Sequence, residues 1–221
     1  MRALTPEILD FLAPDDPRAM RSRRDLARIN WVMRQSAIMA KALAARPQPR
    51  LLADLGGGDG RFLLSVARRL AWPGVKAVIL DRQNIVSEKT RAGFAALGWR
   101  CETLQGDIFD TLPRIEADIV TANLFLHHLD DAALQRLLAL VASHSRALVA
   151  CEPRRSAFAL LGARLVFALG ANDVTRHDAV ASVRGGFRDL DLSLLWPKDR
   201  AWICQERGEF PFSQVFRAHA L

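Results

Sequence analysis

Short apolar runs alternate with amphipathic segments through the middle of the chain. The apolar runs occupy residues 51–54, 75–81, 99–105, 117–122 and 146–151, and the amphipathic segments lie at 60–71, 86–97 and 131–143. In the first amphipathic segment, the apolar residues recur at the spacing of one helical face, at positions 63, 66, 67 and 70. Strands that alternate with helices at this rhythm predict a parallel β-sheet with helices on both of its faces.

The N-terminal part of the chain differs from this alternation. One candidate helix covers residues 18–45, and Pro47 with its polar neighbours marks a boundary before the first strand. The apolar residues of that helix form one stripe, made up of Leu26, Ile29, Met33, Ala40 and Leu43. We therefore predict an N-terminal helical cap segment at 1–48 and a main domain at 49–221, with an insertion at 156–195 after the fifth strand.

A glycine-rich turn follows the first apolar run, in the segment LLADLGGGDGRF at 51–62. Glycine has no Cβ and adopts positive φ freely, so glycines at every second position let a flat polar ligand approach the backbone. A dinucleotide fingerprint would need glycine five positions after Gly56, but that position is Arg61. A phosphate-binding loop would need Gly-Lys-Ser/Thr, whereas Gly60 is followed by Arg-Phe-Leu. The turn therefore indicates a nucleotide-like ligand without a pyrophosphate.

The motif at 54–60, an acid followed by Gly-x-Gly-x-Gly, resembles the first motif of the class I S-adenosylmethionine-dependent methyltransferases. The resemblance covers about residues 50–153 and implies S-adenosyl-L-methionine as the cofactor. It also implies the fold class α/β, as a three-layer, Rossmann-like, seven-stranded and mostly parallel sheet with helices on both faces. Such a sheet has one antiparallel strand, and we assign it to Phe212–His219 within a closing pair of strands.

Three later motifs follow in the order that this family predicts. The resemblance implies that Asp81 binds both ribose hydroxyls, that Asp107 binds the adenine amine, and that Asn123 and Leu124 contact the methionine part of the cofactor. Asp107 or Asp110 could instead cap a turn. Ligands in such sheets bind at the carboxyl ends of the strands, where these residues lie. The complete predicted set is Asp54, Gly56, Gly57, Gly58, Gly60, Asp81, Arg82, Gly106, Asp107, Ile108, Asn123 and Leu124.

Histidines are the candidates for removing a proton from a hydroxyl acceptor, because an imidazole titrates near neutral pH. His127 and His128 follow the fourth strand, near the expected methyl end of the cofactor, although a structural role is open for either. His177 lies between the fifth and sixth strands, where the family builds acceptor pockets, and is our first choice for the base. A satisfied loop histidine is the alternative for it. Glu152-Pro153 also resembles a family feature, or it only fixes an extended exit from the strand.

These residues together predict a methyltransferase that acts on a small, largely apolar acceptor, phenolic or polyketide-like, at oxygen. Two alternatives stay open: carbon methylation of a quinone-like ring, and a catalytically idle cofactor-binding subunit of a partner. A polyamine synthase is disfavoured because residues 121–128 lack the expected acidic pair. Amino methylation of nucleic-acid bases would require Asn-Pro-Pro-Tyr/Phe after the fourth strand, where this chain has Asn-Leu-Phe-Leu.

Composition and charge agree with one globular domain. The chain has 221 residues, of which 50% are hydrophobic and 25% are charged, and its formal net charge is +7. Much of the excess positive charge lies on the helix at 18–45, where a solvated basic face explains it, so we expect no nucleic-acid partner. Weak association with a membrane surface is an alternative. The apolar stretch at 157–171 is interrupted by Arg164 and too short to span a bilayer.

The cysteines and the N-terminal residues indicate in which cellular compartment the protein is expected. Cys101, Cys151 and Cys204 are odd in number and lack metal-type spacing, so we expect reduced thiols and no metal site. The first twelve residues carry two acids and no continuous apolar core, which is unlike a secretory signal. The sequence therefore predicts a cytoplasmic enzyme.

Overall fold

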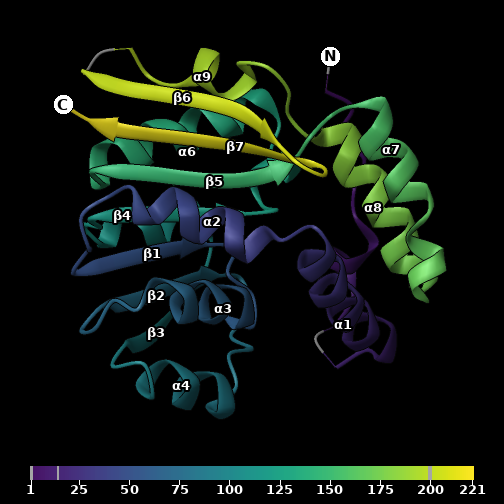
Figure 1. The fold of residues 1–221 in the computed structure, drawn as a ribbon, viewed down its shortest axis with the longest axis horizontal. Coiled ribbons are helices and arrows are strands. Elements are labelled where there is room, and N and C mark those ends of the chain that lie inside the picture. The colour runs from purple at the N-terminus through teal and green to yellow at the C-terminus, as the bar shows by residue number, and fades with distance from the viewer. Residues whose placement is uncertain (1, 14, 199–200) are drawn as a thin grey trace.

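A seven-stranded sheet forms the centre of the molecule (Figure 1). The computed structural model describes residues 2–13, 15–198 and 201–221. The strand order is β3-β2-β1-β4-β5-β7-β6, and of the described strands β7 alone runs in the opposite direction to all the others. The strands are β1 (Leu51–Leu55), β2 (Lys76–Asp81), β3 (Arg100–Gln105), β4 (Ile119–Asn123), β5 (Ala147–Pro153), β6 (Trp202–Glu209) and β7 (Ser213–Ala220). The predicted fold class is confirmed.

The central strands are apolar runs because they are covered on both faces. In β1, Leu52 pairs with Ala77 of β2 on one side and with Ile119 of β4 on the other, and all three are buried. A strand enclosed in this way has no solvent-facing side chains to alternate with buried ones. The closing pair β6 and β7 is antiparallel, and the strand predicted at 212–219 is found at 213–220.

Two layers of helices enclose the sheet. One face packs against α2, α3 and α4 through fully buried side chains such as Met39, Leu63 and Phe94. The other face packs against α5, α6 and α9 through side chains such as Leu137 and Leu192. These helices are α2 (Gln35–Ala44), α3 (Arg61–Leu70), α4 (Glu88–Ala95), α5 (Ile108–Thr111), α6 (Asp131–His144) and α9 (Asp191–Leu195).

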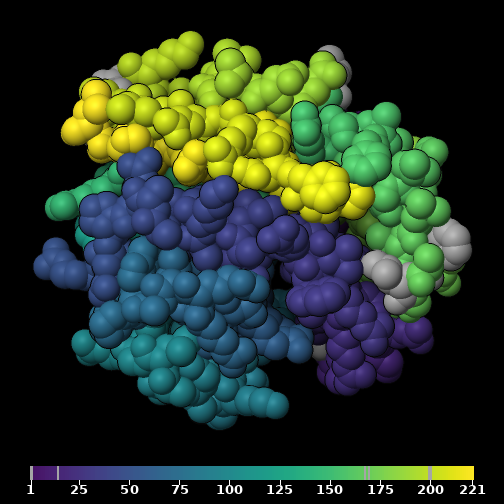
Figure 2. Space-filling view, in the orientation of Figure 1, coloured from purple at the N-terminus to yellow at the C-terminus, as the bar shows by residue number. Residues whose placement is uncertain are grey.

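A third group of helices lies at the carboxyl ends of the parallel strands, on the right in Figure 1. It contains the short 3-10 helix η1 (Ile8–Phe11), α1 (Pro17–Val32), α7 (Ala157–Arg164) and α8 (Asp173–Gly185). The segment 156–195, predicted as an insertion, supplies α7, α8 and α9. In the space-filling view, the surface is hollowed between α1, in purple, and the blue part of the chain that covers the sheet (Figure 2).

The prediction of a single helix over 18–45 is wrong. The helix breaks at Arg34, which has a left-handed backbone with φ of +55°. The Arg34 N–H donates to the Trp31 carbonyl at 3.0 Å. The break turns the chain, so that α1 lies in the helical group at the strand ends while α2 packs on the sheet. The predicted cap at 1–48 therefore divides between two layers.

The buried face of α1 is polar rather than the predicted apolar stripe. Ala19, Ser22 and Asp25 are its buried residues, whereas Leu26 and Ile29 are only partly buried. The hydroxyls of Ser22 and Thr175 are 2.9 Å apart, and Asp25 accepts the N–H of Asn172 at 3.0 Å. Hydrogen bonds to α8 and its N-cap residue thus help to fix α1 in place.

Two further expectations concern the thiols and the membrane. The three cysteines are free, and Cys151 is buried in β5. Among the described helices, none combines the length and the apolar character that crossing a lipid bilayer requires.

Replacing Arg34 with glycine should stabilise the protein. Glycine removes the clash that a Cβ causes in the left-handed region. The larger entropy of glycine in the unfolded chain offsets only part of this gain. We therefore expect a rise of up to about 1 kcal/mol in the free energy of unfolding. The matched control is Arg24→Gly, an exposed position inside α1, where the same change should cost about 1 kcal/mol. Urea denaturation measures both, and a loss of stability in Arg34→Gly would contradict the assignment of strain.

Candidate active site

The glycine-rich turn between β1 and α3 is open on one side and covered on the other. Gly58 has φ of +55°, and a Cβ built on it would meet no atom within 4 Å. A Cβ on Gly56, with φ of +62°, would lie 2.2 Å from ring carbon Cδ2 of Phe125. The backbone at Gly58 is therefore accessible to a ligand, whereas the Phe125 ring closes the turn at Gly56.

Asp81 joins the end of β2 to this turn. One of its carboxylate oxygens accepts the Gly58 N–H at 2.9 Å, and the other accepts the Gln83 N–H at 2.8 Å. Each oxygen has a second lone pair, so that the carboxylate can accept two further hydrogen bonds from a ligand. The predicted neighbours Gly56, Gly58 and Asp81 are thus brought together.

Asp107 stands at the start of α5, on the side of β3. Its carboxylate accepts the Phe109 N–H and an Arg82 N–H, both at 2.9 Å, and these bonds hold the pKa of Asp107 below its ordinary value. It caps this short helix, which is the alternative that the sequence left open. Gly106 donates its N–H to the Asp81 carbonyl at 3.0 Å, and Ile108 is buried beside it. The residues predicted for the adenine side therefore lie next to Asp81.

Asp54 is buried beneath the turn. Burial raises the pKa of Asp54 to about 7, against a hydrogen bond from the Thr121 hydroxyl at 2.7 Å that lowers it. The negative charge of Asp81 adds to the rise in this pKa. A Cβ on Gly57 would come within 2.7 Å of an Asp54 oxygen, so the glycine lets the acid reach its position.

The end of β4 carries an unsatisfied acceptor. Asn123 Oδ1 is buried and has no hydrogen-bond partner among the described residues. Leu124 has φ of +51° and donates its N–H to the Cys151 carbonyl at 3.0 Å. A buried oxygen without a donor costs about 1–3 kcal/mol, so that a ligand with an N–H or O–H would be favoured there.

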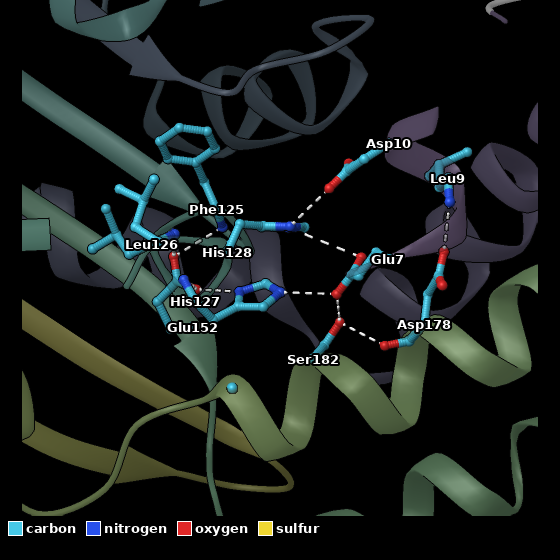
Figure 3. A network of polar contacts seen from close by, with 12 residues as sticks. Glu7, Leu9, Asp10, Phe125, Leu126, His127, His128, Glu152, Asp178 and Ser182 are labelled. Atoms are coloured by element: carbon cyan, nitrogen blue, oxygen red, sulfur yellow. Dashed lines mark hydrogen bonds and ion pairs between the residues drawn. The ribbon is translucent and has the colours of Figure 1, made fainter. Parts of the chain in front are cut away.

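The buried carboxylate of Glu152, at the end of β5, organises the segment after β4. It accepts the N–H groups of Phe125 at 3.0 Å and Leu126 at 2.9 Å, and it lies 2.7 Å from Nδ1 of His127 (Figure 3). These bonds hold the 3-10 helix η3 (Leu126–His128) against the sheet. Glu152 therefore does more than fix the exit from its strand.

Two acids from the N-terminal segment face the histidine pair. Glu7 Oε1 lies 3.3 Å from Nε2 of His127, and Asp10 Oδ2 lies 3.2 Å from Nδ1 of His128 (Figure 3). Glu7 also accepts a hydrogen bond from the Ser182 hydroxyl on α8. The two imidazole rings lie with their centroids 4.3 Å apart and their planes tilted by 35°.

The pKa of His127 is shifted because of these acids. Burial by itself would lower the pKa of His127, but hydrogen bonds to Glu152 and Glu7 outweigh it and raise this pKa to about 9. The same contact holds the pKa of Glu7 below its ordinary value despite burial. Sequence reasoning missed Glu7 and Asp10, because more than a hundred residues separate them from the histidines and neither belongs to a motif.

A cavity of about 340 Å³ opens beside this pair. Its walls combine apolar side chains with the two imidazoles and two acids, and they include Leu4, Pro6, Phe11, Ala181, Glu7 and Asp10. His177 is not part of this group. It lies on the exposed side of α8, 2.9 Å from Asp178, and lines a separate hollow with Arg164 and Val180.

Comparisons with known proteins identify the family of this chain and agree with its fold. Residues 11–149 match the O-methyltransferase domain family, and this match covers more than half of the chain. The chain therefore belongs to that family. The mitomycin biosynthesis 6-O-methyltransferase of Streptomyces lavendulae is 35% identical over 94 residues, which are 41% of this chain and 25% of that protein. The chain thus aligns with about a quarter of this curated relative's length.

Solved structures share the fold. A putative O-methyltransferase from Nostoc punctiforme superposes with a TM-score of 0.66 at 17% identity, over 99% of this chain and 64% of that one. The plantazolicin methyltransferase BpumL, solved in complex with SAH, superposes with a TM-score of 0.66 at 10% identity, over 94% of this chain and 92% of that one.

Asp54 should make the stability of the protein fall as pH rises from about 4 to about 7. In that range the folded chain keeps a proton on Asp54 that the unfolded chain releases, so that raising the pH favours unfolding. The isosteric variant Asp54→Asn cannot titrate, and the difference in unfolding free energy between the two proteins should change by a few kcal/mol, on the order of 3, across this range. Urea denaturation at a series of pH values measures it, and a difference independent of pH would contradict the burial argument.

Proposed function

We propose that the chain is an S-adenosylmethionine-dependent O-methyltransferase that acts on a small, largely apolar hydroxyl compound. The observation that carries the proposal is the open backbone at Gly58, held beside the Asp81 carboxylate by a hydrogen bond of 2.9 Å. Family membership and the cofactor-product complex of a neighbour with the same fold support it.

The residues present fit the proposed cofactor. The carboxylate of Asp81 has free lone pairs for two ribose hydroxyls, and the unsatisfied oxygen of Asn123 would accept from the amino group of the methionine part. Asp107 keeps acceptor capacity for the adenine amine while it caps α5. When bound, S-adenosylmethionine supplies a methyl group activated by a sulfonium centre. The contribution of the protein is then to align the acceptor, which can be worth about 7–11 kcal/mol.

The acceptor side of the proposal rests on the cavity at the histidine pair. Leu4, Pro6 and Phe11 offer apolar contacts, and the pair offers groups that take a proton from a hydroxyl. Nδ1 of His127 faces Glu152 at 2.7 Å, so Nε2, which faces Glu7 at 3.3 Å, is the nitrogen on the acceptor side. Because the pKa of His127 is raised to about 9, the ring acts as a base only after it has lost the proton that it shares with these acids. His177 lines the other hollow, away from this cavity, and is therefore not part of the proposed base.

Oxygen is favoured over carbon as the methylated atom. The matching family is described as an O-methyltransferase domain, and the Streptomyces relative is named for methylation at oxygen. If the chain were instead a catalytically idle subunit of a partner, the isolated chain would show no turnover.

Replacing Asp81 with asparagine should weaken cofactor binding at least about tenfold, because one charge-assisted acceptor for the ribose is lost. Asp118→Asn is the matched control: its carboxylate also accepts two backbone N–H groups, those of Arg50 and Leu51, but at the opposite end of the sheet. Calorimetric titration with S-adenosylmethionine and S-adenosylhomocysteine measures both variants. Equal affinities in the two variants would overturn the ribose assignment.

The isolated chain should transfer label from methyl-labelled S-adenosylmethionine to members of a panel of phenolic and polyketide-like acceptors. Replacing His127 or His128 with asparagine should lower turnover by about 10²- to 10⁴-fold, the usual contribution of a positioned acid or base. His144→Asn is the control, because His144 also pairs with a carboxylate, that of Glu116 at 2.7 Å, on the far end of α6. Cofactor binding without turnover on any acceptor would favour the idle subunit.

A further inference from the structure

The solvent-facing side of α7 is apolar. Phe158 is 57% exposed, Leu161 is 53% exposed, and Leu165, directly after the helix, is 49% exposed. These three positions share one side of the helix, whereas the small residues Ala159 and Ala163 are buried and α7 packs against α8. An ordinary surface helix has the reverse arrangement, with large apolar side chains toward the core and polar ones toward water.

The turn between β6 and β7 extends this side of α7. Phe210 in the turn is 79% exposed. The ring centroids of Phe158 and Phe212 lie 5.0 Å apart, and a Cβ built on Gly162 of α7 would come within 2.7 Å of the Phe212 ring. In the space-filling view, the yellow C-terminal strands and the green helices adjoin at the surface (Figure 2). Together the exposed side chains form one apolar face, made up of Phe158, Leu161, Leu165 and Phe210.

The charged residues within and beside the apolar face are mainly arginines. Residues 154–171, which include α7, contain three arginines and neither aspartate nor glutamate. Arg164 is one helical turn after Leu161, at the edge of the face. Arg154 reaches the strand that leads into the turn, because a Cβ on Gly208 would come within 2.5 Å of its Nη1. The face therefore has a cation on each side.

The acids near the apolar face are already paired. Glu209 pairs with Arg207 at 2.5 Å, and Asp173 on α8 pairs with Arg176 at 3.1 Å. By contrast, neither Arg154 nor Arg164 forms an ion pair within the described part of the chain. Two exposed guanidinium groups beside the face are thus left to attract an external anion.

A hollow of about 390 Å³ lies next to the apolar face, between α7 and α8. Arg164 lines it together with Arg176, His177 and Asp173. A phosphate group in the hollow would accept hydrogen bonds from the Arg164 guanidinium, whose planar array of N–H donors matches phosphate oxygens. The protein therefore offers a place for a phosphate directly beside exposed apolar side chains.

We infer that the apolar face, with Arg154 and Arg164, docks on the surface of a membrane that contains anionic lipids. Such a surface matches both features, because its negative headgroups lie directly over an apolar layer. A second copy of the chain would bring arginines against arginines, which is unfavourable. A nucleic acid would pair with the arginines but would leave the leucine side chains without an apolar partner.

The helix α8 connects the apolar face with the cavity at the histidine pair. It packs against α7, and its residues Ala181 and Gly185 line that cavity. A largely apolar acceptor dissolves in lipid, so docking would bring the cavity close to the place where such an acceptor accumulates. This consequence rests on the proposed function, whereas binding to a membrane surface does not.

The experiment measures flotation of the whole chain with lipid vesicles, in the absence of S-adenosylmethionine and of any acceptor. One set of vesicles is phosphatidylcholine alone, and in the other about a third of the lipid is anionic phosphatidylglycerol. We expect the chain to bind the anionic vesicles more tightly than the neutral ones, and to lose affinity as the salt concentration rises from about 0.05 M to about 0.5 M.

Replacements in the face should weaken binding to the anionic vesicles. Leu161→Ser and Phe210→Ser should each do so about tenfold, because each removes apolar area that would enter the interface. Arg164→Gln should do so about fivefold, which is the usual share of one basic residue near an anionic surface. All three positions are exposed, and urea midpoints establish that each variant folds.

Two exposed residues outside the face serve as matched controls. Ile203→Ser removes an apolar side chain at the other end of β6, and Arg100→Gln removes a cation at the start of β3, on the opposite edge of the sheet. Both should bind vesicles as the wild type does. The inference is overturned if the wild type does not bind anionic vesicles, or if the three face variants bind as tightly as the controls. Self-association without lipid that Leu161→Ser abolishes, measured by sedimentation equilibrium, would assign the face to a second copy instead.

Discussion

The buried carboxylate of Glu152 is the interaction on which the acceptor side of this molecule depends. It lies at the end of β5, where a parallel sheet collects the ends of its strands, and it accepts backbone N–H groups from the segment that follows β4. A buried charge is tolerated only when hydrogen bonds replace its lost hydration. Here the donors are backbone N–H groups at the start of η3 and the His127 ring. The hydrogen bonds that offset the cost of burying the acid therefore also fix η3 and His127 in place.

Phe125 connects the two halves of the site. Its N–H is held by Glu152, its ring covers Gly56, and the centroid of that ring lies 6.5 Å from that of His128. Phe125 therefore lies between the proposed cofactor site and His128, which lines the cavity. A change in its position would alter the ligand approach to the glycine turn and the packing against the His128 ring together.

The break at Arg34 has a comparable effect on a larger scale. Because the chain turns there, α2 completes the layer over the sheet while α1 and the segment before it reach the strand ends. Hydrogen bonds hold this group: Asp178 accepts the N–H groups of Ile8 and Leu9, which fixes η1 and with it Glu7 and Asp10. The N-terminal segment thus becomes part of the wall of the cavity.

The sequence by itself determined the strands of the sheet, the helices α3, α4 and α6 and the residues around the glycine turn, because these features repeat with the period of a strand or helix or sit at fixed offsets from a motif. It placed Asp54, Asp81 and Asn123 at one edge, since the ends of parallel strands must meet there. Only the tertiary structure decided the break at Arg34, the position of His177 outside the group, and the meeting of Glu7 and Asp10 with His127 and His128. Those outcomes depend on contacts between segments far apart in the chain, which no local period or spacing encodes.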